Sequence, residues 1–398
     1  MHDSHSTLRN SLESWRIVHS EASLGWGGQE HRTMAELTGF HRRGCQVSLI
    51  AHPQSQIMAR AKVAGIRTHA CTFDRRLLPY DVLRLALWLR REKIQIVNTH
   101  SSRDAWLLGM AARLAFTPLV LRTRHIDVID RSPRVSRYKF TLMADHTLTT
   151  SDKITSYIRK TFKLPEARST TLPTGIDLNL FQSEGARAEL PVRRGPGAPP
   201  VIGMVSVLRS WKGHPLFFEA VRMLRDSGRD FQFVVVGGGA PLEKYAAIAR
   251  LHGVEDCVHF TGHREDVAEV LRALDVLCIP SLRHEGVPQI GLQALACGTP
   301  VVGSDCGGIP EIILEGRTGR IFPTGNASAL AERIAETIDQ QEQTQQMCSS
   351  GRALVESRHS LDSMLDRLHE IYGFYLDSPA VEGAFSPACT QDQVRVPG

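Results

Sequence analysis

Residues 279–313 read IPSLRHEGVPQIGLQALACGTPVVGSDCGGIPEII, and this stretch decides the fold of the chain. The apolar run VLCI at 276–279 predicts a buried strand, and VVGS at 301–304 predicts the next one. Between the two strands, Pro288 is typical of a first helical turn and Gly298 of a helix end. A strand, a helix and a second strand in close succession predict a parallel sheet.

The polar residues of this stretch follow the predicted strands. Glu285 lies in the loop after the first strand, and Gln293 lies one to two turns into the helix. Gly307 and Gly308 follow the second strand and precede another short helix. Because the carboxyl ends of parallel strands meet at one edge of a sheet, we expect a loop carboxylate, a helix side chain and two helix N-termini to converge there.

The same alternation of short β-rich runs and amphipathic helices occurs twice in the chain. It predicts an α/β protein with two doubly wound, Rossmann-like domains that face an interdomain cleft. A stretch rich in Pro, Gly, Ala and Arg separates the two halves and is a natural linker. The predicted segments are a first domain at 15–180, a linker at 181–200, a second domain at 201–360, a last helix at 361–377 and a disordered tail at 378–398.

Within these domains, strands and helices are predicted at particular runs. The strands of the first half are 15–19, 46–51, 66–70, 94–99, 119–123 and 146–150, and those of the second half are 201–207, 231–236, 258–260, 276–279 and 301–304. The clearest helices are Pro79–Arg91, Arg103–Phe116, Ala327–Glu356 and Leu361–Tyr375.

The composition is that of an ordinary globular protein. The chain has 398 residues, which favours two domains, and 42% of them are hydrophobic and 22% charged. No apolar run approaches the roughly 18 residues that span a bilayer. The first residues lack the basic and then apolar layout of a secretion signal, so we expect a cytoplasmic protein.

Charge is unevenly distributed along the chain. The net charge is +5, but residues 1–180 hold 27 Lys and Arg against 15 Asp and Glu, and the remainder holds 20 against 27. One reading of the basic half is a solvated surface. The other is an anionic partner, such as phospholipid headgroups at the inner face of the cytoplasmic membrane or a phosphorylated substrate. Nucleic acid is not favoured, because no helix-turn-helix, zinc-finger or RNA-binding signature is present.

The sequence favours neither a structural metal nor a nicotinamide cofactor. The eight cysteines are scattered without a CxxC pair, and the 17 histidines show no HExxH spacing. The first glycine-bearing loop contains Gly27 and Gly28 in the sequence GWGG, which differs from the GxGxxG of dinucleotide-binding proteins. Such a loop is either a plain tight turn or a place where backbone approaches a ligand. We therefore expect no cofactor.

The second half opens with a comparable loop after its first strand. Arg209 and Lys212 lie there, just before a helix start, where two cations suit a diphosphate. Taken alone, an arginine and a lysine in a loop are more often solvated surface. The GxxxxGK[ST] pattern of a Walker A loop is absent.

Four motifs together resemble one family. They are GWGGQE, LRSWKG, HEGVPQIGLQALACGTPVV and CGGIPEI, and in this order they look like the retaining GT-B glycosyltransferases of family 4. PTGIDLNLF at 173–181 resembles the family segment just before the interdomain linker. The resemblance covers about residues 15–375. It implies that the last helix crosses back onto the first domain.

The resemblance also implies roles for particular residues. Glu285, Lys212, Arg209 and His100 are implied to be catalytic, with the two cations on the donor diphosphate and Glu285 on the donor sugar. Donor contacts are implied for Gly27, Gly28, Gly262, His263, Arg264, Gln293, Gly307, Gly308 and Ile309. Acceptor contacts are implied for Arg124 and His125.

Two positions depart from the family pattern. Gln293 stands where the family has the second acid of its Glu-x7-Glu motif, which binds ribose hydroxyls. A glutamine still accepts and donates hydrogen bonds, so ribose binding can survive with altered strength. Val207 stands where the family has an arginine, and we expect Arg209 to replace it.

These observations predict a metal-independent, retaining glycosyltransferase. Its co-substrate is expected to be a nucleotide diphosphate sugar, and its acceptor a lipid-linked or phosphorylated glycan of bacterial lipopolysaccharide or a related surface polysaccharide. Two alternatives stay open: a nucleotide-sugar-binding protein that has lost transfer activity, for which Gln293 is the hint, and a nucleotide-sugar 2-epimerase of the same fold. The order of the motifs disfavours the epimerase.

Overall fold

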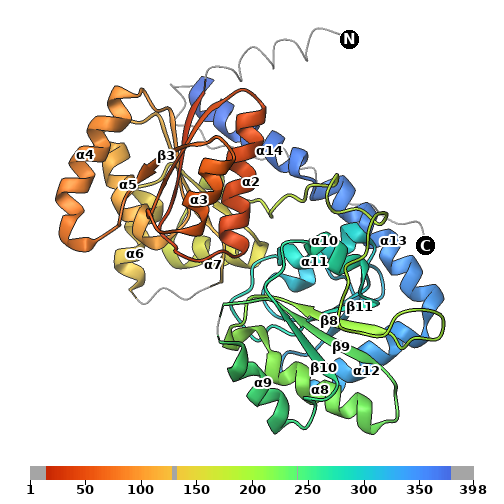
Figure 1. Cartoon of the computed structure of the whole chain (residues 1–398). Helices are drawn as coiled ribbons and strands as arrows, with labels where there is room; N and C mark the ends of the chain where they lie inside the picture. The colour runs from red at the N-terminus through yellow and green to blue at the C-terminus, as the bar shows by residue number, and fades with distance from the viewer. Residues whose placement is uncertain (1–14, 128–131, 240, 378–398) are drawn as a thin grey trace, which may run out of the picture.

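The computed structural model describes residues 15–127, 132–239 and 241–377. It consists of two α/β domains that lie one after the other along the chain (Figure 1). Each domain is built on its own parallel sheet, so the predicted fold class is confirmed. The predicted disordered tail at 378–398 lies outside the described residues.

The first domain contains a seven-stranded parallel sheet of order β3-β2-β1-β4-β5-β6-β7. Its strands are β1 (Arg16–Glu21), β2 (Gln46–Ala51), β3 (Arg67–Ala70), β4 (Ile96–Thr99), β5 (Leu119–Arg124), β6 (His146–Thr149) and β7 (Ser169–Thr171). The helices that cover it are α2 (Gly28–Arg42), α3 (Gln56–Val63), α4 (Leu78–Arg91), α5 (Ser102–Leu114), α6 (Pro133–Thr141) and α7 (Asp152–Phe162). The central strands are buried along their whole length, as expected for a sheet covered on both faces.

The second domain contains a six-stranded parallel sheet of order β10-β9-β8-β11-β12-β13. Its strands are β8 (Val201–Val205), β9 (Gln232–Val236), β10 (Val258–Gly262), β11 (Val276–Ile279), β12 (Val301–Ser304) and β13 (Arg320–Phe322). Its helices are α8 (His214–Asp226), α9 (Leu242–Leu251), α10 (Val267–Arg272), α11 (Gln289–Cys297), α12 (Ala327–Asp339) and α13 (Gln341–Arg358).

The last helix, α14 (Leu361–Asp377), leaves the second domain and packs on α2 of the first (Figure 1). Its apolar face, including Leu365, Leu368 and Tyr372, joins the buried core beside β1 and β2. Gly39 of α2 makes the close approach possible, because a Cβ there would lie 2.4 Å from a methyl carbon of Leu365. Helix α14 is thus part of the same core of the first domain as β1 and β2.

The sequence analysis missed two strands. The short edge strands β7 and β13, of three residues each, were not predicted. Residues 327–356 are helical as predicted except at Gln340, where φ −99° and ψ 61° divide the segment into α12 and α13. Edge strands of this length carry too little periodicity to be recognised from sequence.

Of the helices that the structure describes, none combines the length and the apolar character that crossing a bilayer requires.

Candidate active site

The two sheets meet through the loops at their carboxyl ends. Gly286, in the loop after β11, lies against the first domain so closely that a Cβ would be 2.2 Å from the hydroxyl oxygen of Thr150 and 2.8 Å from the carbonyl oxygen of His125. The Val287 N–H also donates to the Thr150 carbonyl oxygen over 3.4 Å. Any side chain at position 286 would therefore separate the two domains at this point.

Further polar contacts hold the domains together around this point. Glu311 accepts hydrogen bonds from the N–H groups of Asp152 (3.0 Å) and Lys153 (3.3 Å) at the start of α7. A carboxylate is stabilised there by the helix dipole. On the other side of the junction, Arg60 forms an ion pair of 2.6 Å with Glu265. The predicted catalytic loop therefore lies within a closed junction of the two domains.

A lysine–glutamate pair occupies this junction. Lys212 ends a short 3-10 helix after β8, and its ammonium forms an ion pair with the Glu285 carboxylate. Ser281 donates a second hydrogen bond, of 2.6 Å, to the same carboxylate oxygen. Glu285 is only 6% exposed, so the cation is its main electrostatic compensation. The structure thus brings together two of the residues that the sequence predicted to be catalytic.

The glycine loop after β12 packs directly on this carboxylate. Gly307 has φ +61°, and a Cβ there would lie 2.3 Å from the Glu285 carbonyl oxygen. Among the described residues, the N–H groups of Gly307 and Gly308 donate to no acceptor. They are available to an anion or a sugar hydroxyl. The Ile309 N–H, which was predicted to join them, donates to the Cys306 carbonyl oxygen over 3.1 Å, and its donor contact stays a prediction.

Helix α11 presents two glutamines to the junction. Gln289 donates to the Gly28 carbonyl oxygen over 2.5 Å and to the Thr174 hydroxyl over 3.3 Å, and so joins the helix to both ends of the first domain. Gln293 lies one turn further on the same helix face and is half-buried. Gln289 was missed from the sequence, because nothing in its spacing shows that the opposite domain supplies its partners.

The first glycine loop joins β1 to α2 beside this helix. Gly27 caps α2, and a Cβ on it would lie 4.0 Å from Val207 of the second domain. Glu21, which the sequence analysis also missed, fastens the loop by accepting from the Ser23 N–H (2.8 Å) and from the Gln29 amide (2.5 Å). Burial, reinforced by nearby Asp104, raises the pKa of Glu21 to about 8.

In the part of the chain that the structure describes, no other predicted donor residue forms a side-chain hydrogen bond or ion pair with the side chains of Lys212 and Glu285. Arg209 is exposed, and its guanidinium lies 5.0 Å from the centre of the Trp211 ring. Arg264 binds Asp266 with two nitrogens and the Glu189 carbonyl oxygen with a third. Its guanidinium is thus held by its own domain and the linker. Gly262 and His263 lie where β10 ends.

The predicted residues of the first domain differ in their access to the junction. His100 is 1% exposed, and both of its ring nitrogens are engaged, one by His19 and one by His125. The ring therefore lies behind His125, and the catalytic role of His100 stays a prediction. The His125 ring is the outer partner of His100, and the backbone carbonyl oxygen of His125 lies against Gly286. The Arg124 guanidinium packs over the rings of Tyr157 and Phe140.

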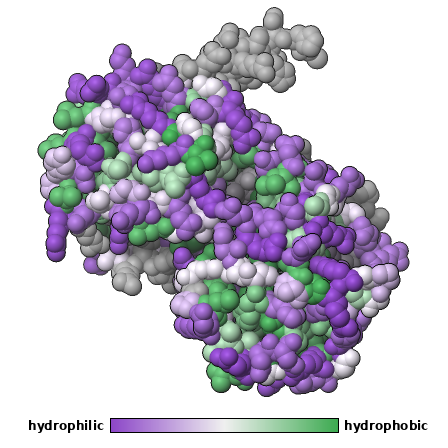
Figure 2. All heavy atoms as spheres, in the orientation of Figure 1, coloured by the Kyte–Doolittle hydropathy of each residue, from purple (hydrophilic) through white to green (hydrophobic). Residues whose placement is uncertain are grey.

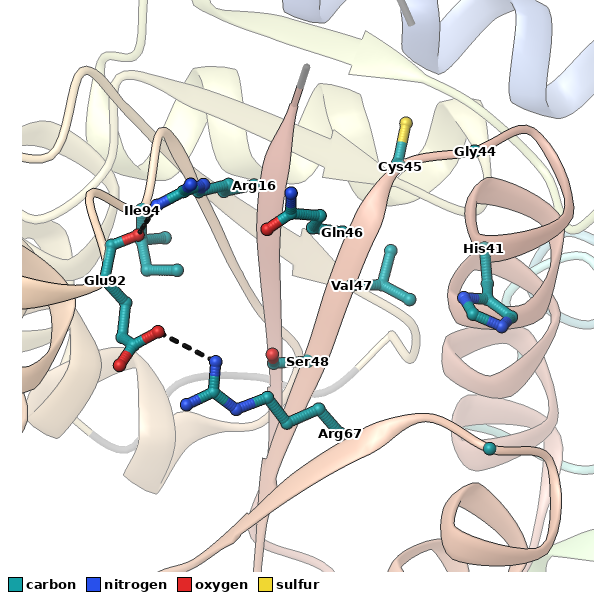
Figure 3. A pocket seen from close by; sticks show the side chains of 11 residues that line it. Arg16, His41, Gly44, Cys45, Gln46, Val47, Ser48, Arg67, Glu92 and Ile94 are labelled. Carbon is teal, nitrogen blue, oxygen red and sulfur yellow. Dashed lines mark hydrogen bonds and ion pairs between the residues drawn. The ribbon is translucent and has the colours of Figure 1, made fainter. Parts of the chain in front are cut away.

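Two open pockets lie elsewhere on the described part of the chain. One, of about 430 Å³, is lined by residues at the amino ends of β1 and β2, including Arg16 and Gln46 (Figure 3). Its Arg67 is tied to Glu92 by an ion pair of 2.8 Å. The other, of about 750 Å³, lies between the linker and α13, beside the residues that precede β8, β11 and β12. Neither cavity contains a residue predicted for the donor or acceptor site.

Two facing parallel-sheet domains with a charged loop pair between them define the class of the protein, a two-domain glycosyltransferase. The chain belongs to the group 1 and family 4 glycosyltransferases. Residues 188–354 match the family described as "Glycosyl transferases group 1", and residues 26–180 match "Glycosyltransferase Family 4". That the protein is a transferase enzyme is thereby confirmed.

Similar proteins include both relatives and solved structures. The GDP-mannose-dependent alpha-(1-6)-phosphatidylinositol monomannoside mannosyltransferase of Mycobacterium tuberculosis is 30% identical over 77% of this chain and 83% of its own length. The D-inositol 3-phosphate glycosyltransferase of Corynebacterium diphtheriae is 26% identical over 74% of this chain and 70% of its own. A glycosyltransferase structure from Rickettsia africae superposes with a TM-score of 0.80 at 19% identity, covering 91% of this chain and 98% of that one.

Proposed function

We propose that this enzyme transfers a sugar from a nucleotide diphosphate sugar to a phosphate-bearing acceptor, with retention at the anomeric carbon. The observation that carries the proposal is the Lys212–Glu285 pair beneath the uncommitted N–H groups of Gly307 and Gly308. A cation and two backbone donors at one sheet edge suit a diphosphate leaving group, and the carboxylate suits the hydroxyls of the transferred sugar.

The chemistry follows from this placement. The bond between the anomeric carbon and the diphosphate oxygen breaks, and negative charge develops on the leaving nucleoside diphosphate. Lys212 and the two glycine N–H groups stabilise that charge. The acceptor hydroxyl attacks from the same face, its oxygen bonds to the anomeric carbon, and its proton passes to a phosphate oxygen. We propose that these fixed charges act in place of a metal ion, so that transfer persists in EDTA.

The acceptor is proposed to be anionic. The first half of the chain holds 27 basic against 15 acidic residues. The mycobacterial relative is named for a phosphatidylinositol acceptor and the corynebacterial one for inositol phosphate, which supports a phosphate group on the acceptor. Within this class we favour a lipid-linked glycan of a bacterial surface polysaccharide such as lipopolysaccharide.

A lipid-linked acceptor requires the enzyme to reach a membrane surface, and α4 offers a suitable face. Tyr80, Leu83 and Leu87 lie on one stripe of this helix and are 64%, 61% and 71% exposed. Exposed arginines lie at both ends of the stripe, Arg76 before it and Arg90 after it. Apolar spheres lie among hydrophilic ones at the left edge of the first domain, where Figure 1 places α4 (Figure 2). We propose that this stripe contacts the anionic inner face of the cytoplasmic membrane.

Vesicle sedimentation tests the stripe. The wild type should bind vesicles that contain phosphatidylglycerol more tightly than pure phosphatidylcholine, and salt should weaken binding. The double variant Leu83→Ser, Leu87→Ser should lower the affinity about tenfold or more, because it removes two apolar contacts. Leu251→Ser is the control, since Leu251 is 85% exposed on the second domain. Equal loss in both variants would contradict the proposal.

Transfer itself is tested with a panel of UDP-, GDP- and ADP-sugars and phosphate-bearing acceptors, with and without EDTA. The proposal expects nucleoside diphosphate release that depends on acceptor, and a product whose anomeric proton coupling in NMR matches that of the donor. Binding of a nucleotide sugar without turnover on any acceptor would favour the sugar-binding alternative. An inverted product would refute retention, and loss of turnover in EDTA with recovery in magnesium would refute metal independence.

A further inference from the structure

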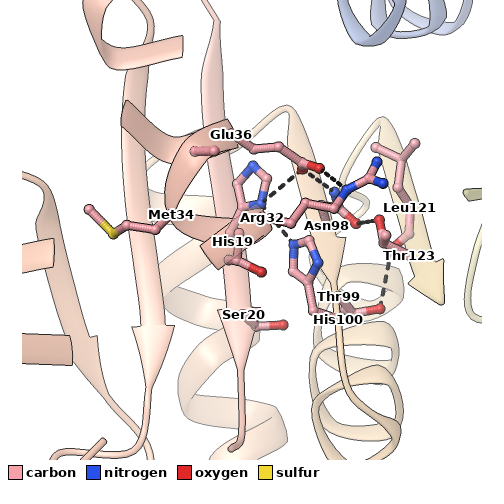
Figure 4. Close-up of polar contacts among 12 residues, drawn as sticks. His19, Ser20, Arg32, Met34, Glu36, Asn98, Thr99, His100, Leu121 and Thr123 are labelled. Carbon is pink, nitrogen blue, oxygen red and sulfur yellow. Dashed lines mark hydrogen bonds and ion pairs between the residues drawn. The ribbon is translucent and has the colours of Figure 1, made fainter. Parts of the chain in front are cut away.

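Three histidines of the first domain are joined ring to ring. His19 lies on β1, while His100 and His125 follow β4 and β5 directly. The His19 Nδ1 atom lies 2.9 Å from His100 Nε2, and His100 Nδ1 lies 2.9 Å from His125 Nε2. The planes of the first two rings differ by 14° and those of the second pair by 31°, and these orientations are compatible with N–H···N hydrogen bonds. Figure 4 shows the inner part of this chain.

All three imidazoles are neutral near pH 7. Burial is the largest cause that lowers the pKa of each ring, and Arg32 lowers all three further. For His19, the Glu36 carboxylate acts in the opposite direction without reversing the shift. A neutral imidazole has one N–H and one bare nitrogen. Each N–H···N bond in the chain therefore determines which nitrogen of the next ring carries the proton.

A buried carboxylate sets the direction at the inner end. Glu36 Oε2 lies 3.7 Å from His19 Nδ1. Glu36 is held in place by the Arg32 Nε at 2.7 Å and by the Asn98 amide at 3.2 Å (Figure 4). A carboxylate attracts an N–H and repels a lone pair, so it favours the proton of His19 on Nδ1. The His19 Nε2 atom is then the bare nitrogen, and it is buried without a hydrogen-bond partner among the described residues.

The backbone of the middle histidine is also fixed. Asp104 accepts hydrogen bonds of 2.8 Å from the His100 N–H and from the Ser20 hydroxyl. It also caps α5 through the Ser101 N–H at 2.8 Å. The backbone of His100 is therefore held beside β1, while its ring is held by the hydrogen bonds to His19 and His125.

We propose that Glu36 orders the tautomers of His19, His100 and His125, so that His125 presents its Nδ1–H as a donor at the domain junction. His19 Nδ1–H donates to His100 Nε2, and His100 Nδ1–H donates to His125 Nε2. His125 Nδ1 then carries a proton and has no acceptor among the described residues. His125 retains 8% exposure, and its backbone carbonyl oxygen lies against Gly286, the neighbour of Glu285 in the chain. In the proposal the Nδ1–H of His125 is the donor to a substrate oxygen, and His19, Glu36 and His100 are positioning residues.

The same atoms offer a different possibility, which the geometry disfavours. One ligand atom from each of His19, Glu36 and His100 lies within 4.8 Å of the others, as a metal site requires. However, a separation of 2.9 Å between two ring nitrogens is a hydrogen-bond distance, and the Arg32 guanidinium already binds the carboxylate. A cation would have to enter a fully buried site beside another cation.

Long-range proton–nitrogen NMR of protein labelled with nitrogen-15 in histidine tests the tautomers without any substrate. Single His→Gln variants at the three positions assign the signals. The proposal expects a protonated Nδ1 and a bare Nε2 on all three rings, in spectra that EDTA leaves unchanged. A proton on Nε2 of His125 would overturn it, and so would EDTA-dependent signals of His19 and His100, which would indicate a bound metal.

Variants test whether the order matters to the reaction, a part that rests on the proposed function. His19→Phe keeps a ring but removes the donor, so His125 should populate both tautomers and turnover should fall about tenfold with little change in donor KM. His146→Gln is the control. His146 is buried on β6 and hydrogen-bonded at both ring nitrogens to side chains other than those of His19, His100 and His125. It should keep both the His125 signals and turnover.

The outcomes separate the two claims. Unchanged His125 tautomers in His19→Phe would overturn the ordering, and unchanged turnover in a variant whose tautomers are mixed would overturn its use in catalysis. If His19→Phe does not fold, the spectrum of the wild type still decides the ordering. If the wild type transfers no sugar although the tautomers are as expected, the proposed function is wrong, but the proposed tautomer order of the three histidines is confirmed.

Discussion

The two sheets have the same design but offer the junction opposite chemistry. The second domain presents an ion pair, Lys212 with Glu285, and two uncommitted backbone donors at Gly307 and Gly308. The first domain presents a neutral chain of histidines that ends at His125. A leaving diphosphate needs charge fixed in advance, whereas a neutral sugar or acceptor hydroxyl needs oriented hydrogen bonds. We therefore propose that the second domain stabilises the charge of the leaving diphosphate and that the first domain orients a sugar or acceptor hydroxyl.

The largest expected effect is the loss of the charge on the second domain. Lys212→Ala should lower kcat on the order of 10²-fold or more, because it removes a fixed cation from the leaving group and leaves buried Glu285 uncompensated. Steady-state kinetics with saturating donor measure the effect. Lys244→Ala, which removes an exposed lysine from α9 of the same domain, should leave kcat unchanged. Near-normal turnover in Lys212→Ala would remove this residue from the mechanism.

A second variant separates the shape of the donor loop from its charge. In Gly307→Ala, a Cβ would lie 2.3 Å from the Glu285 carbonyl oxygen on a backbone with φ +61°, so the loop must move. We expect turnover to fall on the order of tenfold to 10²-fold. Gly298→Ala is the matched control, because Gly298 has φ +71° but its nearest neighbour would be 3.7 Å away. Both variants should lose stability in thermal unfolding, and only Gly307→Ala should lose activity.

The third prediction concerns the two residues of the acidic motif. Gln293→Glu should change kcat less than about tenfold and act mainly on donor KM, because the proposed ribose contact would be made equally in ground and transition states. Glu285→Gln should lower kcat strongly, since the proposed partner of Glu285 is the sugar that gains charge during transfer. Kinetics of both variants with the same donor decide the matter. If Glu285→Gln lowers kcat only slightly while Gln293→Glu abolishes activity, the roles assigned to the two residues are reversed.

The last prediction concerns the stability of the fold at the first glycine loop and leaves the charge of the second domain untouched. The pKa of Glu21 is raised from 4.5 to about 8, so the folded protein keeps a proton that the unfolded chain releases within this range. The group therefore lowers the free energy of unfolding as pH rises from about 5 to 8. Glu21→Gln removes this dependence and should gain stability relative to wild type over that window. The control is Glu92→Gln, because Arg67 lowers the pKa of Glu92 and its titration falls below the window. The melting temperature is measured at each pH from 5 to 8. An equal dependence of Tm on pH in wild type and Glu21→Gln would contradict the assignment.

The sequence allowed the fold to be predicted, and also the convergence of the loops after β11 and β12. These buried strands are continuous apolar runs, and Glu285, Gly307 and Gly308 lie in the loops that follow them, so their convergence could be inferred from parallel topology alone. Residues whose partners lie in the other domain could not be found in this way. Gln289 is recognisable only once Gly28 is seen opposite it.

The histidines show the same limit within one domain. His100 follows β4 as a site residue would, and the sequence does not reveal that His125 lies in front of it. Glu21 and Glu36 likewise lie in ordinary strand and helix patterns. Their importance comes from burial and from the charges around them, which depend on the packing of β1, α2 and α5.

The most direct test of the central claim is a thermal-shift titration of wild type and Lys212→Ala with UDP-, GDP- and ADP-sugars. A true donor at a hundredfold excess over its Kd should stabilise the wild type by about 2.7 kcal/mol, and should stabilise Lys212→Ala clearly less. Such a result would locate nucleotide-sugar binding at the charged loop of the second domain. Equal stabilisation of both proteins, or no stabilisation of the wild type by any nucleotide sugar, would contradict the account.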